Sequence, residues 1–221
     1  MRPTDFVASM PAGNAQGLAQ KSPGRAPGSP AGTRAARSPG SWLAGLLWLA
    51  LAAIMPAHSD GLETWVRVDT GTATLSVLRG KHVIARFGDI SIGRGGVSRR
   101  RLVGDQSTPL GEFRVAKIRE RSQFHRFFII DYPNEARASL ALRRGEIDEP
   151  TFKAIRVAVR AGRLPPQGTS LGGNIGIHGL GAADPRLHEA FNWTRGCIAL
   201  TNEQVDRLTR WIHVGTRVVI D

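Results

Sequence analysis

Apolar and polar positions alternate between Glu63 and Ile92, and this period of two predicts β-strands that bury one face. Thr70-Gly71-Thr72 and Arg79-Gly80-Lys81 interrupt the pattern and are typical of tight turns. The segment therefore predicts consecutive antiparallel strands. The alternating apolar positions are Val66, Val68, Leu75, Val77, Val83, Ala85 and Phe87.

Later segments add two more strands and a change of period. "TPLGEFRVAKI" predicts a turn followed by a strand, and "HRFFIIDY" predicts a strand that ends before Pro133. Between residues 135 and 162 the apolar spacing becomes helical, with Asp148 as an expected N-cap and Gly162 as an expected stop.

The C-terminal segment predicts one more helix and a closing strand. Thr201 and Gln204 have the spacing of a capping box, which predicts a helix that continues through Trp211. "TRVVI" at residues 216–220 is typical of a strand. The body is thus expected to be mainly β, with a helical insertion and a C-terminal helix, and the sequence contains no internal repeat.

The front of the chain has a different composition. Residues 1–41 are rich in Pro, Gly, Ala and Ser, lack apolar periodicity, and predict a disordered basic leader. Residues 42–59 contain the uncharged block "WLAGLLWLALAAIMPA", which is short for a membrane span. It suits a signal peptide that is cleaved near Ala57-His58-Ser59, with an uncleaved membrane anchor as the alternative. Residues 60–221 form the expected folded domain.

The net charge of the chain indicates which classes of molecule it could bind. The whole chain has a formal net charge of +12, and removing the charges of residues 1–41 leaves 25 Lys and Arg against 17 Asp and Glu. A basic, exported domain suits an anionic partner such as cell wall or lipid headgroups. Nucleic acid is a poor fit because the chain has few aromatic side chains for stacking and carries an export signal. Membrane contact is expected only through the N-terminal segment, and the positive flank predicts a periplasmic location.

Cys197 is the only cysteine in the chain, and an exported protein usually pairs its structural cysteines. A buried, inert thiol is one interpretation and a nucleophile is the other. Gly196 precedes the thiol and permits a sharp turn, and Arg195 is a cation that would favour the thiolate. His178 follows a short apolar run and is the candidate base. No spacing of His, Cys or Asp predicts a metal site, and no cofactor is expected.

The segments that contain His178 and Cys197 also resemble those of a known protein family. "IHG" at residues 177–179 and "TRGCI" at residues 194–198, with fifteen residues between His178 and Thr194, resemble the L,D-transpeptidase (YkuD-type) catalytic domain. "TPLGEF" resembles the family's Thr-Pro-x-Gly-x-Phe turn, and the resemblance extends from about Thr64 to the C-terminus. Two departures stand out. Many members carry His where this chain has Arg195, and Asn or Arg-Asn where it has Ile198-Ala199.

The resemblance implies a β-sandwich or open-barrel fold and a thioester mechanism. Cys197 would attack the diaminopimelate carbonyl of a peptidoglycan stem peptide and release D-alanine, with His178 as general base. The carbonyl of Gly179 would orient His178, and the N–H groups of Gly196 and Cys197 would bind the oxyanion.

Further residues are expected to bind the acidic stem peptide. Arg195 and the loop arginines would hold its carboxylates, although a solvated basic loop is an equal interpretation of Arg99, Arg100 and Arg101. The residues expected to line the groove are Arg99, Gly173, Asn174, Trp193 and Thr194.

Three functions remain open at this point. The acceptor of a transpeptidase would be another diaminopimelate or the lysine of a wall-anchored protein. A hydrolase on the same scaffold, either an L,D-carboxypeptidase or an endopeptidase, would use water instead. A wall-binding module without turnover is the more distant alternative.

Overall fold

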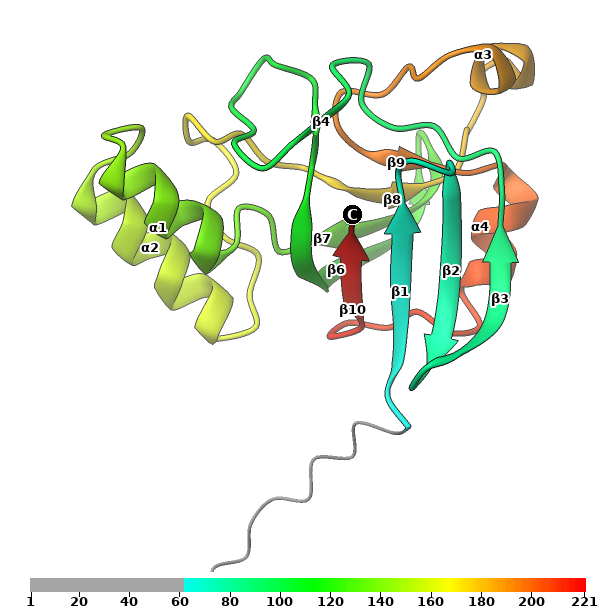
Figure 1. The fold of residues 1–221 in the computed structure, drawn as a ribbon, viewed down its shortest axis with the longest axis horizontal. Helices are drawn as coiled ribbons and strands as arrows, with labels where there is room; N and C mark the ends of the chain where they lie inside the picture. Colours follow the sequence, from blue (N-terminus) through cyan, green and yellow to red (C-terminus); the bar gives the residue numbers. More distant parts are fainter. Residues whose placement is uncertain (1–61) are drawn as a thin grey trace, which may run out of the picture. The chain divides into compact units, whose positions relative to one another are not determined.

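An eight-stranded mixed sheet organises residues 62–221, the part of the chain that the computed structural model describes (Figure 1). Its strand order is β3-β2-β1-β10-β6-β7-β8-β9, and β4 and β5 form a separate small pair. The pairs β1–β10 and β8–β9 are parallel, and the other pairs of the large sheet are antiparallel. The strands are β1 Thr64–Asp69, β2 Thr74–Arg79, β3 His82–Phe87, β4 Val97–Ser98, β5 Thr108–Pro109, β6 Gly111–Ser122, β7 His125–Ile130, β8 Gly176–His178, β9 Ile198–Ala199 and β10 Arg217–Ile220.

β1 follows the predicted alternation, whereas β2 is buried at the four consecutive residues 75–78 and the edge strand β3 is mostly exposed. Val66, Val68, Leu75 and Val77 are fully buried in the main core. Val83 is 49% exposed because β3 is the edge strand and the register shifts between Val77 and Leu78. The period of two therefore predicted the strands but not which of them would lie at the edge.

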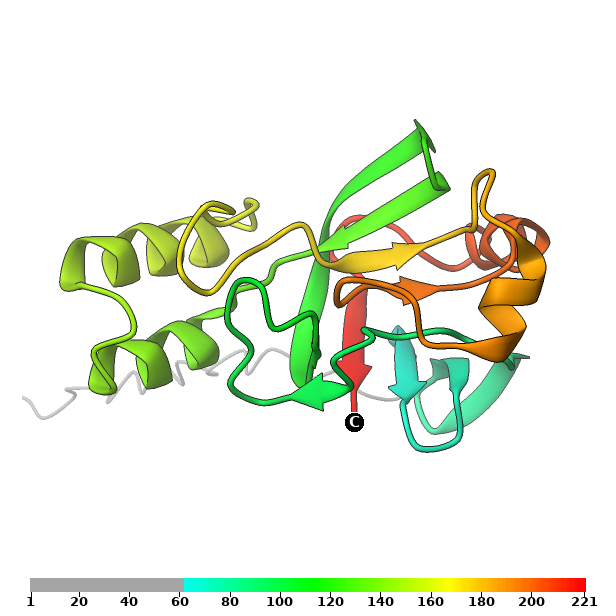
Figure 2. The same cartoon turned by 90° about the horizontal axis from the view of Figure 1, so that it is seen from above.

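The centre of the sheet joins segments that lie far apart in the sequence. β6 and β7 form a long hairpin, which Figure 2 shows projecting from the rest of the domain. β7 pairs with β8, and β8 pairs in parallel with β9. β7 is buried on both faces from Phe127 to Ile130, as expected for an interior strand. This pairing order brings the strand that ends at the predicted base beside the strand that follows the predicted nucleophile.

The predicted helical insertion consists of two helices, α1 Glu135–Arg143 and α2 Glu149–Arg160. Asn134 caps α1, and Asp148 caps α2 by accepting a hydrogen bond from the Thr151 N–H, as the sequence predicted for α2. The two helices lie side by side at one end of the sheet (Figures 1 and 2). They share a small core of their own, made of Ala138, Ala141, Ile147, Ile155 and Leu171.

Two short helices follow β8. α3 runs from Pro185 to Ala190, and α4 runs from Asn202 to Leu208. α4 has the predicted capping box between Thr201 and Gln204, but it ends at Leu208, three residues before the predicted end. The mainly β fold class, with a helical insertion and a C-terminal helix, is confirmed.

The predicted leader at residues 1–41 and the signal or anchor at residues 42–59 lie outside the described residues. Within residues 62–221, none of the helices has the length and apolar character that a membrane crossing requires.

Candidate active site

His178 lies at the end of β8, and Cys197 lies directly before its neighbour β9. The parallel register pairs Ile177 with Ile198. Cys197 stands one residue before the paired positions of β9, and its sulfur accepts a hydrogen bond from the Gly176 backbone of β8. The turn that carries the thiol therefore lies beside the strand that ends at His178. Parallel pairing thus unites two residues that stand nineteen positions apart in the sequence.

The imidazole of His178 is held in one orientation. The ring is 2% exposed, and its Nδ1 lies 2.7 Å from the carbonyl oxygen of Gly179, the contact that the resemblance implied. A carbonyl only accepts hydrogen bonds, so Nδ1 carries the proton and Nε2 has a free lone pair. Phe124 stacks on the ring at 4.4 Å between centroids, and Phe127 and Trp193 contact it edge-on. The neutral tautomer is therefore the one that can act as a base.

The sulfur of Cys197 is half-buried and protonated in this arrangement. Its thiol donates to the carbonyl oxygen of Asn174 across 3.3 Å. Burial raises the pKa of Cys197 to about 11, while a hydrogen bond from the Gly176 backbone and the positive charge of Arg101 act in the opposite direction. A free, preformed thiolate is not the resting state.

His178 has the complementary property. Burial lowers the pKa of His178 to about 4, the hydrogen bond to Gly179 opposes this, and His188 adds a further lowering. At neutral pH both groups are consequently uncharged. A neutral thiol that attacked a substrate would have to give its proton to a base, as in general-base catalysis.

The turn that carries the thiol depends on Thr194 and Gly196. The buried Thr194 hydroxyl donates to the Cys197 carbonyl at 2.7 Å and accepts from the Gly196 N–H at 3.1 Å. Gly196 has a φ of +117°, and a Cβ there would lie 2.5 Å from the Ser107 carbonyl oxygen. The resemblance implied the N–H groups of Gly196 and Cys197 as oxyanion donors. The Gly196 N–H already donates to the Thr194 hydroxyl in this structure.

The residues predicted to bind the substrate differ in their exposure and in the groups that they contact. Asn174 reaches the sulfur through its backbone carbonyl, and neighbouring Gly173 is partly exposed. Trp193 contacts the ring of His178. Arg99 and Arg195 are exposed. The arginine whose charge acts on the sulfur is Arg101, which is 5% exposed, so the solvated-loop interpretation is wrong for this residue.

His188 is a second buried polar residue near this site, and the sequence analysis did not single it out. Its side chain lies in α3 and is 5% exposed. Trp193 donates from Nε1 to Nδ1 of His188 at 3.3 Å, which links α3 to the aromatic group around His178. Nothing in the local pattern distinguishes this histidine from an exposed one, because α3 is too short to show a period.

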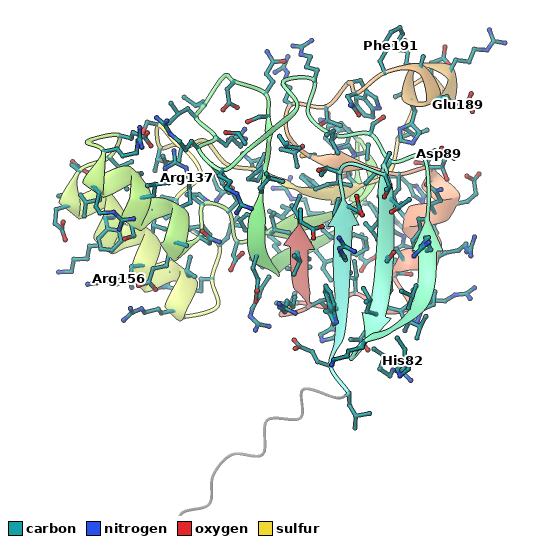
Figure 3. All side chains as sticks on the ribbon, in the orientation of Figure 1. His82, Asp89, Arg137, Arg156, Glu189 and Phe191 are labelled. Carbon is teal, nitrogen blue, oxygen red and sulfur yellow. The ribbon has the colours of Figure 1, made fainter. Side chains whose placement is uncertain are left out.

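A cavity of about 300 Å³ lies between the loop after β3 and the end of α3. Its lining excludes both Cys197 and His178, and Figure 3 labels Asp89, Glu189 and Phe191 on its walls. The lining residues are Ala73, Asp89, Ile90, Ser91, His188, Glu189, Ala190, Phe191 and Asn192. Among residues 62–221, no group of three or more His, Cys, Asp or Glu side chains is arranged to hold a metal ion.

The buried imidazole predicts a pH dependence of stability. His178 has a pKa of about 4 in the folded chain and about 6.5 when unfolded, so folding favours its neutral form. This stabilisation is complete above the unfolded pKa and is lost as the pH falls towards the folded value, by about 3 kcal/mol. Urea unfolding of the H178Q variant should therefore lose less free energy on acidification than the wild type. The H82Q variant, changed at an exposed position, should retain the wild-type loss, and parallel curves for all three proteins would contradict the assignment.

The chain matches a known protein family. A family model for the L,D-transpeptidase catalytic domain (YkuD) matches residues 63–220, which is most of the chain. The chain belongs to this family. The comparison with curated proteins gave no match.

Solved structures similar to the chain include several L,D-transpeptidases. The helical cell shape determining protein Pgp2 from Campylobacter jejuni has 21% identity and a TM-score of 0.49, and the match covers 72% of this chain and 47% of that one. The L,D-transpeptidase from Xylanimonas cellulosilytica has 16% identity and a TM-score of 0.41, with 73% and 61% covered. An Enterococcus faecium L,D-transpeptidase mutant has 14% identity and a TM-score of 0.41, with 72% and 50% covered. The chain spans about half the length of these proteins.

Proposed function

We propose that the chain is an exported cell-wall enzyme, a cysteine-dependent L,D-transpeptidase that acts on peptidoglycan stem tetrapeptides. Membership of the L,D-transpeptidase catalytic-domain family supports this reaction class. The observation that carries the proposal is the fixed tautomer of His178, whose proton sits on Nδ1 against Gly179 and leaves Nε2 with a lone pair, at the end of the strand that pairs with β9 directly after Cys197.

The first half-reaction forms a thioester. The sulfur of Cys197 attacks the diaminopimelate carbonyl while its proton passes to Nε2 of His178. The tetrahedral oxyanion is stabilised by backbone N–H groups at the turn. The carbon–nitrogen bond to D-alanine then breaks, and the imidazolium returns the proton to the departing amine.

The second half-reaction transfers the acyl group. The acceptor amine attacks the thioester carbon and gives a proton to His178, and the carbon–sulfur bond breaks. The thiolate recovers its proton from the imidazolium, which restores the neutral pair. The acceptor is a second diaminopimelate or a lysine of a wall-anchored protein, and water in the same position would make the enzyme a hydrolase.

Charge and exposure support an acidic substrate. The exposed guanidinium groups of Arg99 and Arg195 are available to the stem-peptide carboxylates. Gly173 and Asn174 present partly open backbone beside the sulfur, and Trp193 presents an aromatic surface beside His178. The buried Thr194 shapes the turn through its two hydrogen bonds. The uncharged block at residues 42–59 would direct this domain to the periplasm.

The proposal predicts a covalent intermediate on Cys197. The full chain, incubated with a disaccharide tetrapeptide or a carbapenem, should gain the mass of one acyl group, and peptide mapping should locate it on Cys197. The products then separate the alternatives, since a cross-linked dimer indicates transpeptidation and a free tripeptide indicates hydrolysis. Binding without any adduct or turnover would support a wall-binding module and overturn the enzyme proposal.

A further inference from the structure

Arg101 is the buried member of a run of three arginines. Arg99 and Arg100 are exposed, whereas Arg101 is 5% exposed. Its guanidinium donates to three backbone carbonyls, from Nε to Ser107 at 2.9 Å, from Nη1 to Leu171 at 2.8 Å and from Nη2 to Arg195 at 3.4 Å. These carbonyls belong to three separate loops. One side chain thus ties together the loop after β4, the loop before β8 and the turn that carries Cys197.

Two glycines allow the guanidinium to lie directly against the backbone. A Cβ at Gly196 would stand 3.1 Å from Nε of Arg101, and a Cβ at Gly172 would stand 2.6 Å from Nη1. Gly172 also has a φ of +73°, which L side chains rarely adopt. The residue that precedes the nucleophile is therefore in close contact with a positive charge.

No carboxylate lies within ion-pair distance of that charge in the described residues. None of the ion pairs formed within residues 62–221 includes Arg101. Asp105 interacts electrostatically with Arg101 without forming an ion pair. Its carboxylate oxygens accept hydrogen bonds from the N–H groups of Leu102 and Ser107 and from the Ser107 hydroxyl. The contrast is Arg137, a second buried arginine, which has a Glu146 carboxylate at 2.7 Å.

The backbone of Arg101 is fixed as firmly as its side chain. The Tyr132 hydroxyl and Nη2 of Arg137 both donate to the Arg101 carbonyl, at 3.1 Å and 3.0 Å. The guanidinium carbon lies 5.3 Å from the centroid of the Tyr132 ring, within cation–π range. Arg137 comes from α1, at the end of the helical pair that faces these loops (Figure 3). The helical insertion therefore helps to hold the charge in place.

We propose that Arg101 is a positioning residue whose buried guanidinium holds the Cys197 turn and supplies a positive charge, outside any ion pair, that stabilises the thiolate formed during the reaction. This inference rests on the proposed role of Cys197 as nucleophile. A buried charge acts through a medium of low dielectric constant, whereas water screens an exposed charge such as that of Arg195. Burial alone raises the pKa of the Cys197 thiol, and Arg101 is the cation that opposes the rise.

The test compares two replacements that differ mainly in charge. Glutamine and lysine at position 101 both lose the planar fork but can still donate to a carbonyl, and only lysine keeps the positive charge. The rate of Cys197 alkylation by iodoacetamide, followed by intact mass from about pH 7 to about pH 9, reports the thiolate fraction. R101Q should react about tenfold more slowly at each pH, as expected for a rise of one pKa unit. R101K should remain within about threefold of the wild type because the charge is retained.

The matched control is R86Q, which removes an exposed guanidinium on the edge strand β3 and should leave the alkylation rate unchanged. Equal rates for folded R101Q and R101K would overturn the proposal. Circular dichroism shows whether R101Q folds. If it does not, R101K alone decides: a folded R101K that reacts tenfold more slowly than the wild type would overturn the proposal, and a wild-type rate would support it. Because alkylation needs no turnover, a failure here is distinct from failure of the proposed enzymatic activity.

Discussion

Replacing Cys197 with alanine is expected to abolish D-alanine release, with a loss of about 10⁴-fold or more, as for other covalent nucleophiles. The single cysteine leaves no second thiol to take over the reaction. C197S should be almost as inactive, because a hydroxyl in this site faces a base whose pKa is only about 4. The measurement is the release of D-alanine from purified tetrapeptide muropeptides by the full chain.

Loss of folding must be separated from loss of chemistry in this experiment. The Cys197 side chain is half-buried and its hydrogen bonds are to the backbone of Asn174 and Gly176, so C197A should unfold within a few degrees of the wild type. S139A is a matched control, since it also deletes one small polar group from a partly buried position, on α1 and away from the sulfur. Undiminished D-alanine release from a well-folded C197A would end the nucleophile assignment.

Much of the fold follows from local patterns in the sequence. The period of two placed β1 and β2 correctly because one face of each strand packs into the core. Asp148 and Thr201 marked the starts of α2 and α4 because their side chains satisfy N–H groups that no helix can pair internally. Such signals depend only on a few neighbouring residues, which is why they can be read before the tertiary structure is known.

The site required information that no local pattern contains. Three identical side chains follow one another at Arg99, Arg100 and Arg101. Only the path of the loop decides which guanidinium is buried. The burial of His188 depends likewise on packing beneath α3. The proximity of His178 and Cys197 follows from the parallel pairing of β8 with β9, a long-range contact that the sequence indicated only through its family resemblance.

Replacing His178 with glutamine should lower the rate of D-alanine release by about 10³-fold, within the range for a general base. Glutamine approximates the size of imidazole but cannot take a proton from the thiol. In the wild type the acid limb of kcat/KM should lie near pH 4 rather than near 6.5, since the base must be neutral and burial lowers its pKa to about 4. H178Q should lack this limb, because the group that titrates has been removed.

The control for this prediction is H82Q, which changes an exposed histidine on the edge strand β3. It should keep both the wild-type rate and the acid limb. The pH profile is the decisive readout, because a purely structural role of His178 would lower the rate without moving the limb. An H178Q variant that retains the limb near pH 4 would assign the base to another residue. Loss of the limb together with the rate would tie proton transfer to the ring that Gly179 orients.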